Sequence, residues 1–276
     1  MPRPDAPAVG TTKWRAGVWD EGEDRLAAEE PLQILINGEP LSVVMRTPGS
    51  DLELALGLLW SERVITDLGQ VTRVLISAEA AETEARLNVA GELVESNLID
   101  LHLAGAVHLP ERSFLASSAC GVCGATTIES LALDFPPLPD GPVLPASLLP
   151  VLPERLRAGQ RVFDQTGGLH AAGLFDLEGQ LRILREDVGR HNAVDKVVGR
   201  ALLDGLLPAA GYLLAVSGRA GYEIVQKAIA AGIPVLAAVG APSSLAVATA
   251  RKFNQSLVGF LRGDRFNVYS GGRRLV

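Results

Sequence analysis

The stretch YLLAVSGRAGYEIVQKAIAAGIPVLAAVG, residues 212–240, contains two short apolar runs separated by an amphipathic segment. The runs at 212–217 and 234–240 have the length and composition of buried strands, and residues 221–232 predict a helix that ends at a glycine. The alternation continues toward the C-terminus, with a helix predicted at 243–254 and strands predicted at 256–262 and 266–271. Strands that alternate with helices predict a three-layer α/β domain whose sheet is largely parallel at its centre.

Upstream of this stretch, residues 168–186 predict a pair of strands that turn near Glu178-Gly179, and residues 189–205 predict a further helix. A dense run of prolines, DFPPLPDGPVLPASLLP, precedes these elements at 134–150. We therefore assign residues 115–276 to the α/β domain.

The first part of the chain has a different pattern. Residues 32–47 predict a hairpin that turns at Asn37-Gly38, a dipeptide suited to positive backbone φ. The following segment, 50–65, predicts a helix in which Ser50 and Glu53 have the spacing of a capping box. A second hairpin is predicted from the segments at 71–79 and 84–91. These elements predict a smaller N-terminal α+β domain over residues 1–114, with the first 12 or so residues disordered.

Composition excludes several classes of protein. The chain has 276 residues, of which 47% are hydrophobic and 21% charged, as expected of a globular protein. Its net charge of −7 argues against a general nucleic-acid binder, although residues 251–276 carry six basic residues and one acidic residue. With no apolar signal segment and no run long enough to cross a bilayer, we expect a cytoplasmic protein with no membrane partner.

The only two cysteines, Cys120 and Cys123, lie in the segment SSACGVCGATT at 117–127. The candidate interpretations of this pair are a zinc site, a redox pair and a sulfur carrier. The structural alternative is that both are small cysteines of the core. Structural zinc normally requires four ligands, and a thioredoxin-like pair requires a helix start, which this glycine-rich segment does not predict. A loop of small residues would instead give a thiolate the access that attack on a sulfur atom requires.

Two further segments contain clustered polar residues. REDVGRHNAVDKVVGR, residues 185–200, places His191 among acids and bases at a predicted helix start, and TGGLHAA at 166–172 places His170 after two glycines. Each segment also has a structural interpretation. Residues 185–200 could form only a capped, salt-bridged helix, and His170 could be a hydrogen-bonded structural histidine.

Five motifs in the same order resemble the formate dehydrogenase accessory sulfurtransferases, the FdhD family. The motifs are CGVCG (120–124), TGGLHAA (166–172), EDVGRHNAVDK (186–196), SGRAGYEIVQKA (217–228) and LVGFLRGDRFNVY (257–269). The resemblance implies that the protein receives persulfide sulfur from a cysteine desulfurase and passes it to the molybdenum cofactor, Mo-bis(molybdopterin guanine dinucleotide), on behalf of formate dehydrogenase. It also implies a homodimer and a C-terminal domain similar to the cytidine deaminase fold.

Residue roles follow from the resemblance motif by motif. The persulfide position matches Cys120, with Cys123 as the second member of the pair, and no structural metal is implied. The cofactor-binding stretch matches Phe260, Leu261, Arg262, Gly263, Asp264 and Arg265. His191 is expected to line the same cleft, because the resemblance is dense around it.

The residues themselves support part of this assignment. Arg262 and Arg265 supply guanidinium groups that can bind the phosphates of a guanine nucleotide in a chain that is otherwise acidic. Deamination is excluded, because the triplet His170-Ala171-Ala172 lacks the glutamate that deaminases use to move protons. A cofactor-binding chaperone without sulfur transfer and a zinc-binding protein remain the alternative functions.

Overall fold

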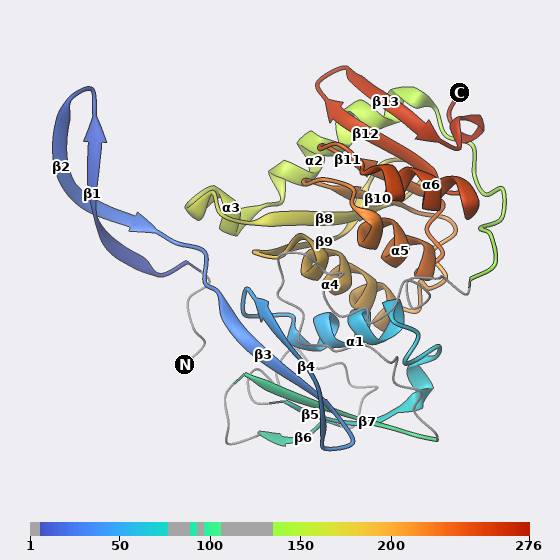
Figure 1. Cartoon of the computed structure of the whole chain (residues 1–276), viewed down its shortest axis with the longest axis horizontal. Coiled ribbons are helices and arrows are strands. Elements are labelled where there is room, and N and C mark those ends of the chain that lie inside the picture. The colour runs from blue at the N-terminus through green and yellow to red at the C-terminus, as the bar shows by residue number, and fades with distance from the viewer. Residues whose placement is uncertain (1–5, 77–88, 93–96, 106–134) are drawn as a thin grey trace.

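The computed structural model of the chain describes residues 6–76, 89–92, 97–105 and 135–276. Two sheets form the body with helices packed between them, and a two-stranded arm projects from one side (Figure 1). The boundary expected at 114/115 lies outside the described residues.

The larger sheet has the strand order β13-β12-β11-β10-β8-β9. Its central strands β10, β11 and β12 are parallel to one another, whereas β8, β9 and β13 run antiparallel to their neighbours. In sequence order the strands are β8 (His170–Phe175), β9 (Leu181–Asp187), β10 (Leu213–Val216), β11 (Val235–Ala238), β12 (Ser256–Arg262) and β13 (Arg265–Ser270). The α/β class predicted from the sequence is confirmed.

Helices cover both faces of this sheet. Alternate side chains of β10 point to opposite faces, so Leu214 and Val216 join one buried cluster while Leu213 and Ala215 join another. The first cluster includes residues of α4 (Arg190–Leu203), α5 (Tyr222–Ala230) and α6 (Ser244–Lys252). The second includes residues of the 3-10 helix η4 (Ala146–Val151) and of α2 (Leu152–Ala158), which α3 (Arg161–Thr166) follows. Burial on both faces explains why the central strands are continuous apolar runs.

The smaller sheet has the order β4-β3-β7-β5-β6. Its strands are β3 (Glu30–Ile36), β4 (Glu39–Arg46), β5 (Val71–Ile76), β6 (Val89–Glu92) and β7 (Leu98–Leu103). The hairpin predicted at Asn37-Gly38 is confirmed, and both turn residues have positive φ, 53° and 84°. The second predicted hairpin is wrong, because β5 pairs in parallel with β6 and its antiparallel partner is β7.

Helix α1 (Asp51–Ser61) joins the two parts of the molecule by crossing α4 at very short range. A Cβ atom on Gly57 would lie 1.9 Å from the carbonyl oxygen of Asp195, and one on Gly199 would lie 1.9 Å from the carbonyl oxygen of Glu53. Glycine is therefore required on both helices for the two backbones to approach this closely.

The capping box predicted for this helix is wrong. Ser50 adopts a left-handed conformation and its side chain makes no cap, while the carboxylate of Glu53 forms a two-point ion pair with Arg185 of β9. The acid that was expected to cap its own helix instead binds the helix to the other sheet.

The projecting arm consists of β1 (Ala8–Arg15) and β2 (Val18–Arg25), and Trp14 and Trp19 face one another across it. Both indoles are largely exposed, at 59% and 69%. Residues 8–12, which belong to the segment expected to be disordered, are part of β1 and pair with β2 along the arm. Within the part of the chain that the structure describes, no helix is both long and apolar enough to span a bilayer.

Candidate functional site

The topology of the larger sheet brings several predicted segments to one edge. The parallel strands β10, β11 and β12 all end there, and so does β9, because it is antiparallel to β8. His170 lies at the same edge since it begins β8, which runs opposite to β10. Helices α4 and α5 begin there as well (Figure 1). Ligands of open α/β sheets bind at this kind of edge, outside the carboxyl ends of parallel strands.

Glycines allow the loops at this edge to pack against one another. The amide of Gly240 donates to the carbonyl of Gly218 at 2.9 Å, and the amide of Phe260 donates to the carbonyl of Gly240 at 3.1 Å. A Cβ atom on Gly240 would lie 2.8 Å from the Gly218 carbonyl oxygen. The loops after β10 and β11 and the last residues of β12 therefore form one hydrogen-bonded surface.

The predicted cofactor-binding stretch forms the end of β12 and the turn into β13. Phe260 has a φ of 53° and a ring that is 42% exposed, a conformation that is uncommon for a bulky side chain and recurs at ligand sites. Arg262, Gly263, Asp264 and Arg265 are all exposed, and the Arg262 guanidinium donates to the carbonyl of Val239. Leu261 differs from its neighbours, because it is buried in the core.

A cavity of about 620 Å³ opens beside these loops. Its walls combine apolar side chains with a few polar groups, a composition typical of small-molecule sites. Val239, whose carbonyl accepts from Arg262, lies in this wall with His170 and Ser217. The TGGLHAA segment therefore lines the cavity directly, and the FLRGDR turn reaches its wall through the contact of Arg262 with Val239.

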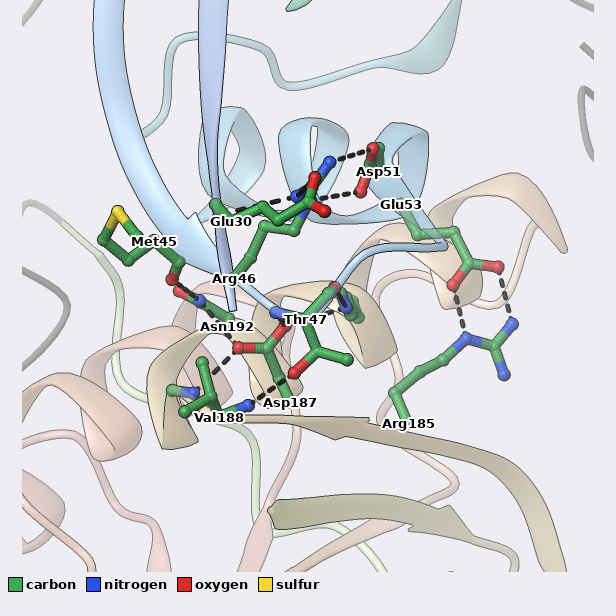
Figure 2. Close-up of polar contacts among 12 residues, drawn as sticks. Glu30, Met45, Arg46, Thr47, Asp51, Glu53, Arg185, Asp187, Val188 and Asn192 are labelled. Atoms are coloured by element: carbon green, nitrogen blue, oxygen red, sulfur yellow. Dashed lines mark hydrogen bonds and ion pairs between the residues drawn. The ribbon is translucent and has the colours of Figure 1, made fainter. Parts of the chain in front are cut away.

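The motif at 186–196 has a structural part, which is centred on Asp187, and a part that lies at the edge where the loops meet. Asp187 is fully buried and accepts hydrogen bonds from the amides of Thr47 and Gly189 and from the side chain of Asn192 (Figure 2). Lys196 pairs with the same carboxylate at 2.8 Å and also donates to the carbonyl of Thr47. These contacts fix the loop after β4 of the smaller sheet against the start of α4.

Replacing Asp187 with Asn is expected to lower the free energy of unfolding by about 3 kcal/mol, because it breaks a buried ion pair and leaves the Lys196 amine buried without its partner. Denaturant unfolding of the purified variant measures this. Adding Lys196→Met to Asp187→Asn is expected to restore part of the loss, since the second change removes the stranded charge. A single variant as stable as the wild type would show that this pair does not join the two parts.

His191 lies at the start of α4, at the edge where the loops meet. Its Nε2 is 3.1 Å from a carboxylate oxygen of Glu223 in the first turn of α5. One turn deeper on the same two helices, Asp195 and Lys227 form a second pair at 2.8 Å. Burial raises the pKa of Glu223 to about 7, so the outer pair changes charge near neutral pH.

Sequence reasoning missed two groups at this edge: Arg219, which follows Gly218, and Glu223, which pairs with His191. Arg190, a charged neighbour of His191, lies beside Gly218. The available signal was SGRAGY at 217–222, where glycines and an arginine directly follow a buried strand. The two predicted sulfur residues, Cys120 and Cys123, lie outside the described residues. Within those residues no group of three histidine, cysteine or acidic side chains could hold a metal ion.

The fold and this edge define a class of protein: a two-sheet α/β protein with a cavity of about 620 Å³ beside glycine-rich and arginine-bearing loops. The model of the FdhD/NarQ family matches residues 27–276, and the chain belongs to that family.

Similar proteins extend over nearly the whole chain. The sulfur carrier protein FdhD of Streptomyces avermitilis is 48% identical over 273 residues, covering 95% of this chain and 93% of that relative. The protein of the same name from Mycobacterium tuberculosis is 45% identical and covers 92% of both. A solved structure from Desulfotalea psychrophila, described provisionally as a formate dehydrogenase accessory protein, has a TM-score of 0.75 at 24% identity over 99% of this chain and all of the other.

Proposed function

We propose that this protein is a sulfur carrier that takes persulfide sulfur from a cysteine desulfurase and delivers it to Mo-bis(molybdopterin guanine dinucleotide) for formate dehydrogenase. The observation that carries the proposal is the near full-length similarity to proteins named sulfur carriers, at 45–49% identity among those compared. Cys120 is the proposed carrier, and Cys123 is the second member of the pair.

The transfer onto the protein is a thiolate exchange. The thiolate of Cys120 attacks the outer sulfur of the donor's persulfide, the sulfur–sulfur bond of the donor breaks, and the donor leaves as a thiolate. Cys120 then carries the extra sulfur as its own persulfide. No oxidant or reductant is consumed in this step, since one sulfur–sulfur bond replaces another.

The cofactor is the cargo of this reaction, and the carboxyl edge of the larger sheet is its proposed binding surface. The cavity of about 620 Å³ has room for a planar base, and the exposed ring of Phe260, outside the cavity lining, offers an alternative surface for packing. Arg262 and Arg265 pair in register across their turn, so both guanidinium groups are carried on one short hairpin. That arrangement suits the pyrophosphate of a guanine nucleotide.

Replacing Arg262 and Arg265 together by Ala is expected to weaken GDP binding by roughly two orders of magnitude, because each charge-assisted contact contributes about 1.5–3 kcal/mol. Calorimetric titration of GDP into the wild type and the double variant measures the difference. Affinity in the wild type should also fall as salt is raised, since screening acts on the same contacts. Equal affinity for GDP in both proteins would show that this turn does not bind the nucleotide.

The function as a whole is tested by maturation of formate dehydrogenase. Formate dehydrogenase produced in cells that lack any protein of this family should be inactive, and supplying this chain should restore formate oxidation. Equal activity with and without the chain would contradict the proposal.

A further inference from the structure

We propose that Arg190 and Arg219, together with His170, form a second anion site at the carboxyl edge, which binds a phosphate-type oxyanion. The proposal rests on the proposed function only in taking that oxyanion to belong to the same ligand as the one bound at Phe260–Arg265. The site is chemically separate from Arg262 and Arg265, so each can be tested without the other.

Three elements converge on Gly218 to make this site. A Cβ atom on Gly218 would lie 3.3 Å from Nδ1 of His170, at the start of β8, and 3.8 Å from Cδ of Arg190, at the start of α4. Arg219 follows Gly218 in the loop after β10 and is exposed. The absence of a side chain at Gly218 leaves the space between these basic groups open.

Among the described residues, neither Arg190 nor Arg219 forms a close ion pair. Arg190 lies near enough to Glu223 to act on the pKa of that carboxyl, but its buried Nε has no hydrogen-bond partner. Arg185 and Arg200, which are half-buried like Arg190, both pair with acids. A buried donor without an acceptor is costly, and a bound oxyanion would supply the acceptor.

The pKa of His170 responds to the same positive charges. Burial lowers the pKa of His170, and Arg190 and Arg219 lower it further, while Asp187 acts in the opposite direction. The effect of Asp187 is limited because its carboxylate already pairs with Lys196. An anion bound between the arginines would offset their charge and raise the pKa of His170.

Three helices point their N-termini at this edge, and two of them lack a side-chain cap. Helix α4 begins after Gly189 and α5 begins after Gly221, and neither has a side-chain cap. Helix α6, which starts beyond β11, has its first turn capped by Ser243. Uncapped amide groups and the positive ends of two helix dipoles add to the attraction that the arginines exert on an anion.

The spacing of the strands indicates what kind of ligand would occupy both sites. Arg219 follows β10 and Arg262 ends β12, and β11 lies between these strands. Neighbouring strands are about 4.8 Å apart, so the two strands that lead to these arginines are about 10 Å apart. A ligand with two separated phosphate-type groups, such as a dinucleotide, fits this pattern better than a mononucleotide does.

Inorganic pyrophosphate is a suitable probe, because it lacks a base and a metal. Calorimetric titration into the full-length chain carrying Arg262→Ala and Arg265→Ala isolates the proposed site. In that background, Arg190→Gln and Arg219→Gln are each expected to weaken pyrophosphate binding at least tenfold. Arg182→Gln is the matched control, since it removes the same charge from an exposed position near the opposite end of β9. Its affinity for pyrophosphate should equal that of the background.

A second readout follows the ring of His170. The chain has four histidines, so imidazole signals in an NMR spectrum can be assigned with His170→Gln. Pyrophosphate is expected to raise the pKa of His170 in the background protein and to leave it unchanged in Arg190→Gln. Two results would contradict the second site: undiminished pyrophosphate binding in both arginine variants, or an unchanged pKa of His170 at saturating pyrophosphate. Loss of GDP binding in Arg262→Ala/Arg265→Ala would still support the proposed function in that case.

Discussion

Cys120→Ala is expected to abolish sulfur transfer completely, because the proposed carrier atom is then absent. The fold is expected to survive, since the neighbours of Cys120 in sequence are small and uncharged, unlike the bulky residues of the core clusters. The loss is measured in two assays. The first follows sulfur from L-cysteine through a cysteine desulfurase to the protein, and the second measures the activity of the formate dehydrogenase that results.

Cys123→Ala is the matched control for this prediction. The two changes remove the same atom from positions three residues apart, so a general effect of losing a thiol would appear in both. A milder defect is expected for Cys123→Ala. If Cys123 were the more essential of the two, the assignment of the carrier would be reversed, and a large fall in melting temperature for Cys120→Ala would indicate a structural cysteine.

Gly199→Val is expected to destabilise the protein by at least 4 kcal/mol or so, enough to leave much of it unfolded. Even a Cβ atom at this position would overlap the carbonyl oxygen of Glu53, and backbone cannot rotate away as a side chain can. Helices α1 and α4 would have to separate, which would also disturb the contacts of Asp187 with Thr47. Thermal and denaturant unfolding measure the effect.

Gly211→Val is the control for the helix crossing. Gly211 precedes β10, and no atom lies within 4 Å of a Cβ built there. The same substitution is therefore expected to change the free energy of unfolding by no more than about 0.5 kcal/mol. Similar losses at both positions would show that the close approach of the helices is not the cause.

The larger sheet could be predicted from sequence because its strands carry the signal locally. Apolar runs such as 213–216, bounded by glycine-rich turns and separated by amphipathic helices, specify α/β structure without knowledge of distant contacts. The hairpin at Asn37-Gly38 was predictable for the same reason, since the dipeptide itself favours the turn. The second hairpin failed because the partner of β5 is a strand that begins more than 20 residues later, at Leu98. Local periodicity does not reveal which strands pair.

The contacts between the two parts of the molecule were not predictable either. Ser50 and Glu53 satisfy the spacing of a capping box, but Glu53 gains more from a two-point pair with Arg185, over 130 residues away in the chain. Asp187, Asn192 and Lys196 were visible only as a polar helix start. Their roles in holding Thr47 and Met45 depend on the packing of α1 against α4.

The sequence predicts some of the residues of the candidate site, but not how they are placed relative to one another. The basic segment around Arg262 and Arg265 could be identified from its charge in an acidic chain. That Leu261 points into the core, and that His170 borders the same cavity as Val239, required the register of β8, β11 and β12. Arg190 and Arg219 are separated by 29 positions and meet only because α4 and the loop after β10 share one edge.

The central claim is that this chain carries sulfur on Cys120, and the mass of the intact protein tests it most directly. After incubation with a cysteine desulfurase and L-cysteine, the wild type is expected to gain the mass of one sulfur atom that a reducing agent removes, and peptide analysis should locate it on Cys120. Cys120→Ala, treated in the same way, should gain none. A wild-type protein that binds GDP but never gains sulfur would contradict the claim and leave a cofactor-binding chaperone as the better description.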